Sequence, residues 1–242
     1  MKAIYKREMF AYFTSPTGYL VLAFSLFVSG FLFVKTNMNN IPDAGVAVFT
    51  TNLVQFFSLV TYVLLLLVPL ITMHLWAEEK KNKTDQLLLT SSLPVSSIIL
   101  GKYFACLSLF AINVLIMLIY PFTMSFYGTV VWTNVFMLYF GYFLLGSALL
   151  SVGLFVSTLT ESQFVSAIIT FVLVLTMFLF KVFTSSVNIG FIADIIEWFS
   201  LFSRFDVFVY GFIDISTIIY YLSFSGLFVF LSIVFIQKKR WN

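Results

Sequence analysis

Six long apolar stretches constrain this chain more than any other feature of its sequence. They run over residues 18–34, 53–75, 98–123, 134–156, 164–183 and 218–236. A helix needs about 20 apolar residues to cross a bilayer, so each stretch is long enough to form a membrane span. The sequence therefore predicts an all-α integral membrane protein, a single transmembrane domain over residues 1–242.

The composition excludes the other fold classes. Hydrophobic residues make up 61% of the chain and charged residues 10%, whereas a soluble domain has ~45–50% and ~25%. A soluble enzyme of this size would lack the charges needed to cover its surface. A disordered chain would be poor in aromatic residues, which make up 20% here. The net charge of +3 is small and the bases are scattered, so no nucleic acid partner is expected.

The basic residues are unevenly shared between the connections. With the N-terminus in the cytoplasm, ten of the 13 fall on that side, namely Lys2, Lys6, Arg7, Lys80, Lys81, Lys83, Lys102, Lys238, Lys239 and Arg240. Lys35, Lys181 and Arg204 fall outside. Because basic residues accumulate in cytoplasmic connections, we expect both termini in the cytoplasm.

The segment before the first span has the pattern of a short amphipathic helix. Apolar Tyr5, Met9, Tyr12 and Phe13 share one face, Arg7, Glu8 and Ala11 the other, with Lys2 and Lys6 at the border. Aromatic residues on such a helix lie in the headgroup zone, so the pattern predicts an interfacial helix. Ser15-Pro16-Thr17-Gly18 ends it.

The connection between the second and third spans, residues 77–97, places a leucine run beside charges. Asn82 is predicted to cap a short helix with Asp85 in its first turn. Residues 87–89 are all leucine, and an uncovered apolar patch of this kind is unusual. From the residues alone, the leucines either pack on the membrane face of this protein or dock into a partner.

The connection between the fifth and sixth spans, residues 184–217, is too charged for a seventh span and too apolar for a solvated loop. Short interfacial or re-entrant helices fit it best.

Chemical motifs are mostly missing. The chain has no Gly-x-x-x-x-Gly-Lys-Ser/Thr loop for phosphates, and its single His74 cannot form a metal site alone. No span holds paired carboxylates, which argues against an ion-coupled carrier. Asn113, well inside the third span, is the best candidate for a pathway residue. We therefore expect no catalysis and no metal or cofactor in this chain.

Three regions, in chain order, resemble the ABC-2 type permeases of ATP-binding cassette exporters. The first is Tyr5 to Glu8 with Tyr12 to Tyr19, similar to that family's interfacial helix and its Ser-Pro-x-Gly-Tyr turn. The second is Glu78 to Thr90 with Pro94-Val95-Ser96 and Leu100-Gly101-Lys102, similar to its coupling-helix loop. The third, Phe205 to Asp214, Tyr220 to Ser223 and Lys239-Arg240-Trp241, is similar to the gliding-motility-associated subgroup.

Two positions depart from the family pattern. Lys83 stands where the family usually has glycine before Thr84, which leaves the turn geometry open. About one extra residue lies between Leu89 and Pro94, which leaves the register of the docking helix open.

The resemblance implies a permease subunit in the inner membrane of a bacterium that forms the substrate pathway. Two copies of a cytoplasmic ATPase would bind ATP and magnesium, and the coupling loop would dock into them. The implied loop residues are Glu78, Glu79, Asn82, Thr84, Asp85, Leu87, Leu88, Leu89, Pro94, Gly101 and Lys102. Further implied partners are a second permease copy or paralogue, an auxiliary membrane subunit with an outer domain, and membrane lipid.

An alternative from another class is a non-transporting scaffold or signalling component that uses a partner ATPase to assemble or drive a surface machine. A secondary carrier is a third possibility, and the missing intramembrane carboxylate argues against it.

Overall fold

The structure is a computed structural model that describes residues 1–38, 47–81, 83–84, 90, 94–126, 130–186 and 200–241. Within these residues the regular elements are all α-helices. They are α1 (Lys2–Thr14), α2 (Pro16–Met38), α3 (Ala47–Thr72), α4 (Ala77–Lys81), α6 (Val95–Met117), α7 (Ile119–Ser125), α8 (Trp132–Leu159), α9 (Gln163–Ser186), α11 (Leu201–Val209) and α12 (Ile215–Trp241).

Six helical stretches are long and apolar enough to cross a membrane. They cover residues 16–37, 52–81, 95–125, 132–159, 163–183 and 215–240. Each of the six stretches predicted from the sequence lies inside one of them. The prediction of a multi-pass, all-α membrane protein is confirmed.

The third span is divided at Leu118 into α6 and α7. Pro121 lies inside α7, and it has no amide hydrogen to donate to the carbonyl of Met117 four residues earlier. The hydroxyl of Tyr139 on α8 donates to that carbonyl at 2.6 Å. The neighbouring helix therefore supplies the hydrogen bond that the proline removes, as a break inside a bilayer requires.

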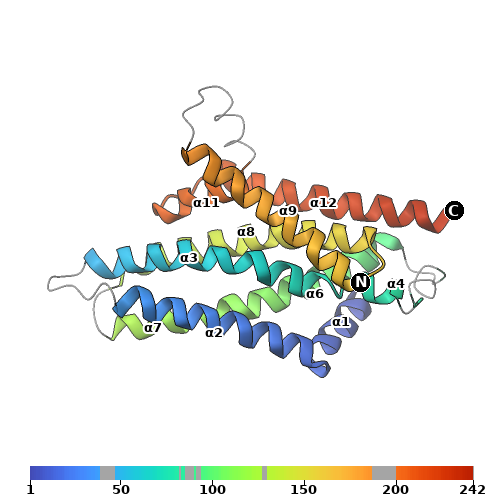
Figure 1. Cartoon of the computed structure of the whole chain (residues 1–242), viewed down its shortest axis with the longest axis horizontal. Helices are drawn as coiled ribbons and strands as arrows, with labels where there is room; N and C mark the ends of the chain where they lie inside the picture. Colours follow the sequence, from blue (N-terminus) through green and yellow to red (C-terminus); the bar gives the residue numbers. More distant parts are fainter. Residues whose placement is uncertain are drawn as a thin grey trace.

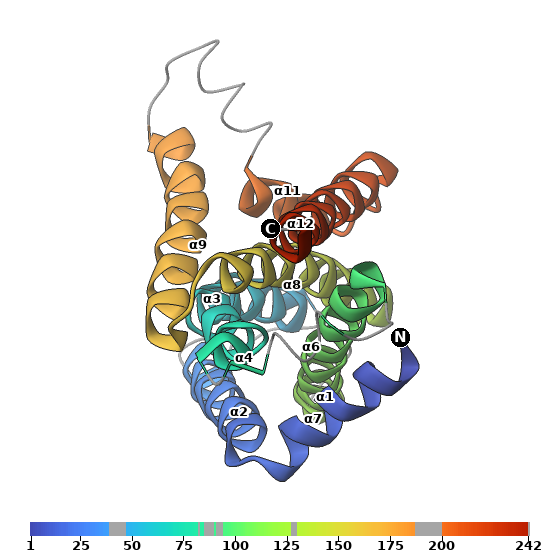
Figure 2. The same ribbon diagram turned by 90° about the vertical axis from the view of Figure 1, so that its right-hand side faces the viewer.

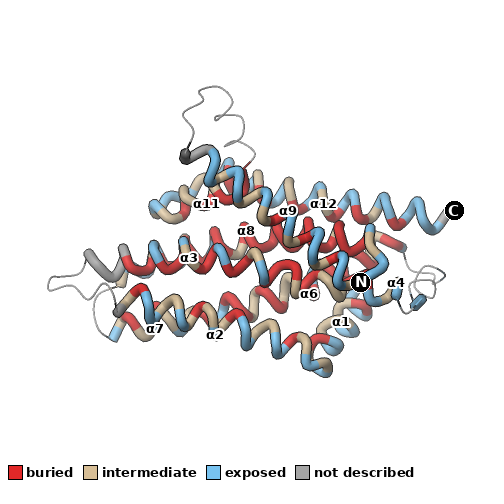
Figure 3. The backbone as a smooth tube through the Cα atoms, viewed as in Figure 1, coloured by how far each residue is buried: buried red, intermediate tan, exposed pale blue. Residues whose placement is uncertain are grey.

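Helix α8 forms the centre of the bundle, with the other spans arranged around it (Figures 1 and 2). In the most apolar 18-residue stretch of α8, 78% of the residues are buried. The corresponding values are 17% for α9 and 22% for α12. Buried residues follow α3, α6 and α8, whereas α2, α9 and α12 alternate between buried and exposed positions (Figure 3). Exposed apolar side chains on these outer helices suit contact with lipid.

The two termini lie at the same end of the bundle, near α1 and α4 (Figure 1). An even number of crossings requires this arrangement. Which side of the membrane this end faces stays a prediction from the distribution of basic residues.

A short helix precedes the last span, as predicted. Helix α11 buries Leu201, Phe202, Phe205 and Phe208, and the backbone carbonyl of Leu201 accepts a hydrogen bond from the hydroxyl of Tyr221 on α12 at 2.7 Å. The remaining predicted short helices of this connection fall on residues 187–199, outside the described residues. Helix α11 therefore packs as part of the bundle, away from the end that holds α1.

Candidate functional site: the α1–α4–α6 junction

Helix α1 lies across one end of the bundle and packs against α2 and α6 (Figure 2). The hydroxyls of Tyr5 and Ser108 are 2.9 Å apart, which links α1 to α6. The hydroxyl of Tyr12 donates to the backbone carbonyl of Ile71 on α3 at 3.2 Å. The N-terminal helix predicted from the sequence thus exists and is fastened to two spans.

Gly101 allows the close approach of α1 to α6. A Cβ at this position would lie 3.1 Å from Cγ2 of Ile4, which is itself buried on α1. Real Cβ atoms rarely make contacts this short, so a larger side chain would push the two helices apart. Gly101, predicted as part of the coupling loop, lies at the contact between α1 and α6.

Four charged side chains meet where α1, α4 and α6 come together. Lys102 of α6 is only 1% exposed, and its ammonium lies 3.2 Å from Glu8 Oε1 and 2.9 Å from Glu79 Oε2. Arg7 lies 2.6 Å from Oε1 of Glu8 and 2.6 Å from Oε1 of Glu79. We call these four residues the junction cluster. Two cations and two anions balance, as burial of charges requires.

Further contacts fix the lysine of the junction cluster. Its ammonium donates to the backbone carbonyl of Leu75 at 2.5 Å and lies 5.3 Å from the ring centre of Trp76. Trp76 is 1% exposed. Lys102 therefore joins the start of α6 to the corner between α3 and α4 as well as to α1.

The position of Glu8 corrects one prediction. The sequence pattern placed Glu8 on the polar outer face of α1, yet its side chain is only 14% exposed and faces α6. Burial opposes ionisation of Glu8, but Lys102 and Arg7 outweigh that effect, so the pKa of this carboxyl lies below its ordinary value. Helical periodicity placed Glu8 by polarity, whereas its partner on α6 lies 94 residues away in sequence.

Helix α4 is anchored on α8 as well as on the junction cluster. The hydroxyl of Ser157 accepts from the backbone amides of Trp76 at 3.0 Å and Ala77 at 3.2 Å. It thereby satisfies amides at the start of α4 that have no partner within that helix. The ammonium of Lys80 donates to the backbone carbonyl of Thr158. These contacts connect α4 to the central span.

The end of α4 has the hydrogen bonds of a Schellman motif. The amide of Thr84 donates to the carbonyl of Glu79 at 2.9 Å, and the amide of Lys83 to that of Lys80 at 3.1 Å. Lys83 has a φ of 56°, in the left-handed region. Glycine is the usual residue at this position of the motif. The lysine thus adopts the backbone conformation that a glycine would.

Several residues predicted for the coupling loop lie outside the described residues, namely Asn82, Asp85, Leu87, Leu88 and Leu89. Their helix, its register and its docking stay predictions. Pro94 is described and precedes the first residue of α6. Glu79 and Lys102, two further predicted residues, pair with each other inside this chain.

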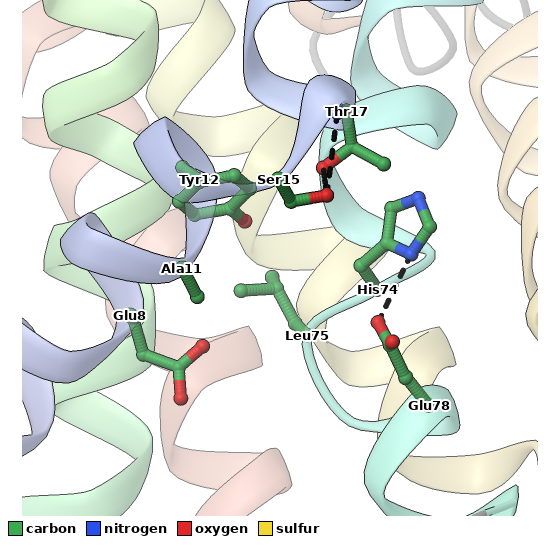
Figure 4. A pocket seen from close by; sticks show the side chains of 8 residues that line it. All are labelled: Glu8, Ala11, Tyr12, Ser15, Thr17, His74, Leu75 and Glu78. Carbon is green, nitrogen blue, oxygen red and sulfur yellow. Dashed lines mark hydrogen bonds and ion pairs between the residues drawn. The ribbon is translucent and has the colours of Figure 1, made fainter.

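A cavity of about 140 Å³ lies beside the junction cluster, between α1, the start of α2 and the α3–α4 corner. Ser15 and Thr17 line it from one side, and His74 and Glu78 from another (Figure 4). The imidazole Nδ1 of His74 lies 3.1 Å from Oε2 of Glu78. Among the described residues, no three His, Cys, Asp or Glu side chains come together as a metal site would require.

Asn113, the predicted pathway residue, is 1% exposed on α6. Its side-chain oxygen accepts from the hydroxyl of Ser25 on α2 at 2.7 Å. It lies at a contact between two helices of the same chain, and a role in a pathway stays a prediction.

A scan against models of protein families and a search of curated proteins both found no match for this chain.

Proposed function

We propose that this protein is the permease subunit of an ABC-2 type exporter, driven by ATP hydrolysis in a separate ATPase subunit. The observation that carries the proposal is the junction cluster. It ties α1, α4 and α6 together at the end of the bundle where residues 82–93, the middle of the predicted coupling loop, join α4 to α6. A force applied to that loop would therefore reach several spans at once.

The turn at Lys83 supports the same proposal. The residues of the loop resemble a family pattern that has glycine before the threonine. The backbone at Lys83 takes the left-handed conformation for which glycine is favoured. The backbone at Lys83 is thus compatible with the glycine that the pattern has at this position.

In the proposed mechanism, Leu87 and Leu88 dock into a cleft on the ATPase, and ATP brings two ATPase copies together. The loop moves with them, and the junction cluster transmits the motion to α1 and α6. Anchoring of α4 on Ser157 and Thr158 passes it to α8. The spans then rock as bodies between two states that make different contacts.

The substrate pathway lies between two permease copies in this proposal, since six spans are too few to enclose a wide channel. The protein itself performs no catalysis, and ATP and magnesium bind to the partner. The site faces the cytoplasm of a bacterial cell, in keeping with the basic residues at that end.

The docking step is tested with the double variant Leu87→Asp plus Leu88→Asp, co-expressed with the cognate ATPase. Two buried charges in an apolar interface should abolish a stable complex and ATP-driven export. The matched control is Thr90→Asp plus Ser91→Asp, which adds the same charges to the same loop and keeps the leucines. Intact complex formation and export in the leucine variant would show that the docking proposal is wrong.

Reconstituted vesicles separate export from the scaffold alternative. An exporter should hydrolyse ATP faster when its substrate is present and accumulate that substrate across the membrane. A complex that hydrolyses ATP without moving any substrate would instead favour the scaffold or signalling component.

A further inference from the structure

The end of the bundle opposite the junction cluster holds another ion pair. The ammonium of Lys181 on α9 donates to Oδ1 of Asp206 on α11 at 2.6 Å. Lys181 lies two residues before the C-terminal end of the candidate span 163–183, whereas α11 lies outside all six spans. An ionisable residue within a span is costly and is usually kept for a ligand, a pathway or a partner. The pair is therefore a candidate binding site separate from the junction cluster.

A pocket of about 190 Å³ opens beside this pair, between α3, α9 and α11. Aromatic side chains form its wall: the ring of Phe178 packs edge-on against Tyr62 at 5.0 Å and against Phe202 at 5.4 Å between centroids. Lys181 and Asp206 line the same pocket. An apolar wall beside a charged pair suits a molecule with one polar and one apolar end.

The hydrogen-bond donors of the pocket favour a negatively charged polar end. The hydroxyls of Ser58 and Thr61 already donate to carbonyls of their own helix, at 3.0 Å and 2.8 Å. The hydroxyl of Tyr62 has no hydrogen-bond partner among the described residues. The hydroxyl of Tyr62 and the ammonium of Lys181 are thus the two donors of the pocket wall that suit a ligand, and an anion accepts from both.

The placement of the two charges points the same way. An anionic group that takes the place of Asp206 at Lys181 leaves an aspartate that is 40% exposed and can be hydrated. A cationic group that takes the place of Lys181 would instead separate Asp206 from a lysine that is 33% exposed at the end of a span. This second exchange is the less favourable one, because the lysine loses a partner next to the hydrocarbon region, where charges are poorly solvated.

We propose that the pocket between α3, α9 and α11 binds the anionic head group, phosphate or carboxylate, of an amphipathic molecule. Lys181 and Tyr62 hold the head group, and the apolar chain lies against Phe178 and Phe202. Asp206 competes with the head group for Lys181. This inference goes beyond the exporter proposal and does not depend on it, since binding needs no ATPase.

The purified full chain in an uncharged detergent tests the proposal by native mass spectrometry. The probes are lysophosphatidylglycerol, which is anionic, and lysophosphatidylcholine of the same chain length, which is zwitterionic. The anionic probe should bind about ten-fold more tightly, the effect of one charge-assisted hydrogen bond. Lys181→Gln should remove this preference, and Lys181→Arg should retain it.

The competing aspartate gives the sharpest test. Asp206→Asn should bind the anionic probe several-fold more tightly than the natural chain, because the carboxylate of Asp206 no longer competes with the probe for Lys181. If the ion pair only stabilises the fold, Asp206→Asn will weaken binding as Lys181→Gln does, and the proposal fails. The control Lys35→Gln removes an exposed cation at the end of α2. An equal loss in that control would show general attraction to charge and would also overturn the proposal.

Two sources could supply such a ligand: a phospholipid of the membrane or an exported amphiphile. If the ligand is exported, the anionic probe should raise ATP hydrolysis by the complex with the ATPase, and Lys181→Gln should abolish this increase. If it is a resident lipid, ATP hydrolysis will not respond, while binding to the chain alone persists. Both results are compatible with the proposal, and the binding experiment decides whether the pocket holds an anionic head group.

Discussion

At the scale of single residues, the junction cluster shows how a lysine is kept charged in an apolar chain. Lys102 is almost fully buried, and two carboxylates from different helices lie within 3.2 Å of its ammonium. Such a cluster adds little stability over a well-packed apolar core, but removal of one member leaves a buried charge unpaired. Its residues are therefore coupled, and a variant at one position must be judged with its partners.

Lys102→Met should destabilise the protein by about 3–5 kcal/mol, because two largely buried carboxylates would share the single cation Arg7. The double variant Lys102→Met plus Glu79→Gln restores the charge balance and should recover a large part of the loss. Thermal and denaturant unfolding of the purified chain in detergent measure both effects. The control Lys6→Met, at an exposed position of α1, should change stability by less than about 0.5 kcal/mol. Additive losses in the double variant would contradict the coupling.

Lys83→Gly should stabilise the protein by about 1 kcal/mol, because a lysine in the left-handed region bears a steric cost that glycine avoids. The control Lys81→Gly changes the same residue type two positions earlier, inside α4. It should be destabilising by up to about 1 kcal/mol, the usual effect of glycine within a helix. The two substitutions should change the free energy of unfolding in opposite directions. Unfolding transitions of the two purified variants measure both changes. A loss of stability in Lys83→Gly would mean that the turn is not left-handed.

At the scale of elements, α1 matters because of what it touches. It contacts α2 through the turn that follows it, α3 through Tyr12, α4 through Arg7 and α6 through Tyr5 and Glu8. Because α1 contacts four other helices, any relative movement of those helices must shift α1 or break some of these contacts. In the proposed exporter, α1 and α4 would move together when the coupling loop is displaced.

Gly101→Val should release α1 from α6. The Cβ of the new valine would lie 3.1 Å from Cγ2 of Ile4, and the methyl groups of the valine would come closer still. Amide hydrogen exchange over residues 2–14 should rise by at least about ten-fold. The control Gly226→Val makes the same change inside α12, where no atom lies within 4 Å of the added Cβ. Exchange of α1 in that control should match the natural chain. Protection of α1 in Gly101→Val equal to the natural chain would refute the close contact.

At the scale of the whole molecule, the bundle has two ends with different chemistry. One end holds both termini, α1, α4 and the junction cluster (Figure 1). The other holds α11 with the Lys181–Asp206 pair and its pocket. If the first end receives a force from an ATPase, the second is where an exported molecule would leave, and α8 runs between them.

Cysteine labelling tests which end faces the cytoplasm. The single natural cysteine, Cys106, is buried, so one introduced cysteine at a time reports its own position. In intact cells, Lys83→Cys should react with a maleimide only if the reagent crosses the membrane. Asn188→Cys should react with an impermeant reagent. The opposite pattern would reverse the orientation and would remove the basis for docking to a cytoplasmic ATPase.

Much of the fold could be predicted because spanning a membrane imposes a local requirement. Each span must be apolar over about 20 residues, and this is readable from consecutive residues without knowledge of their neighbours. The six spans, the helix at the N-terminus and a short helix before the last span follow from this and from local breakers such as Pro16. For the same reason, the boundary at Pro94 could be read directly from the chain.

The tertiary structure alone decided which polar residues meet. Glu8, Glu79 and Lys102 are far apart in sequence and look like ordinary charges near span ends, yet packing of α1 and α4 on α6 buries them together. The left-handed turn at Lys83 and the pocket beside Lys181 were equally invisible to hydropathy. Hydropathy measures the preference of each residue for lipid, whereas an ion pair or a pocket depends on the distance between elements that only packing sets.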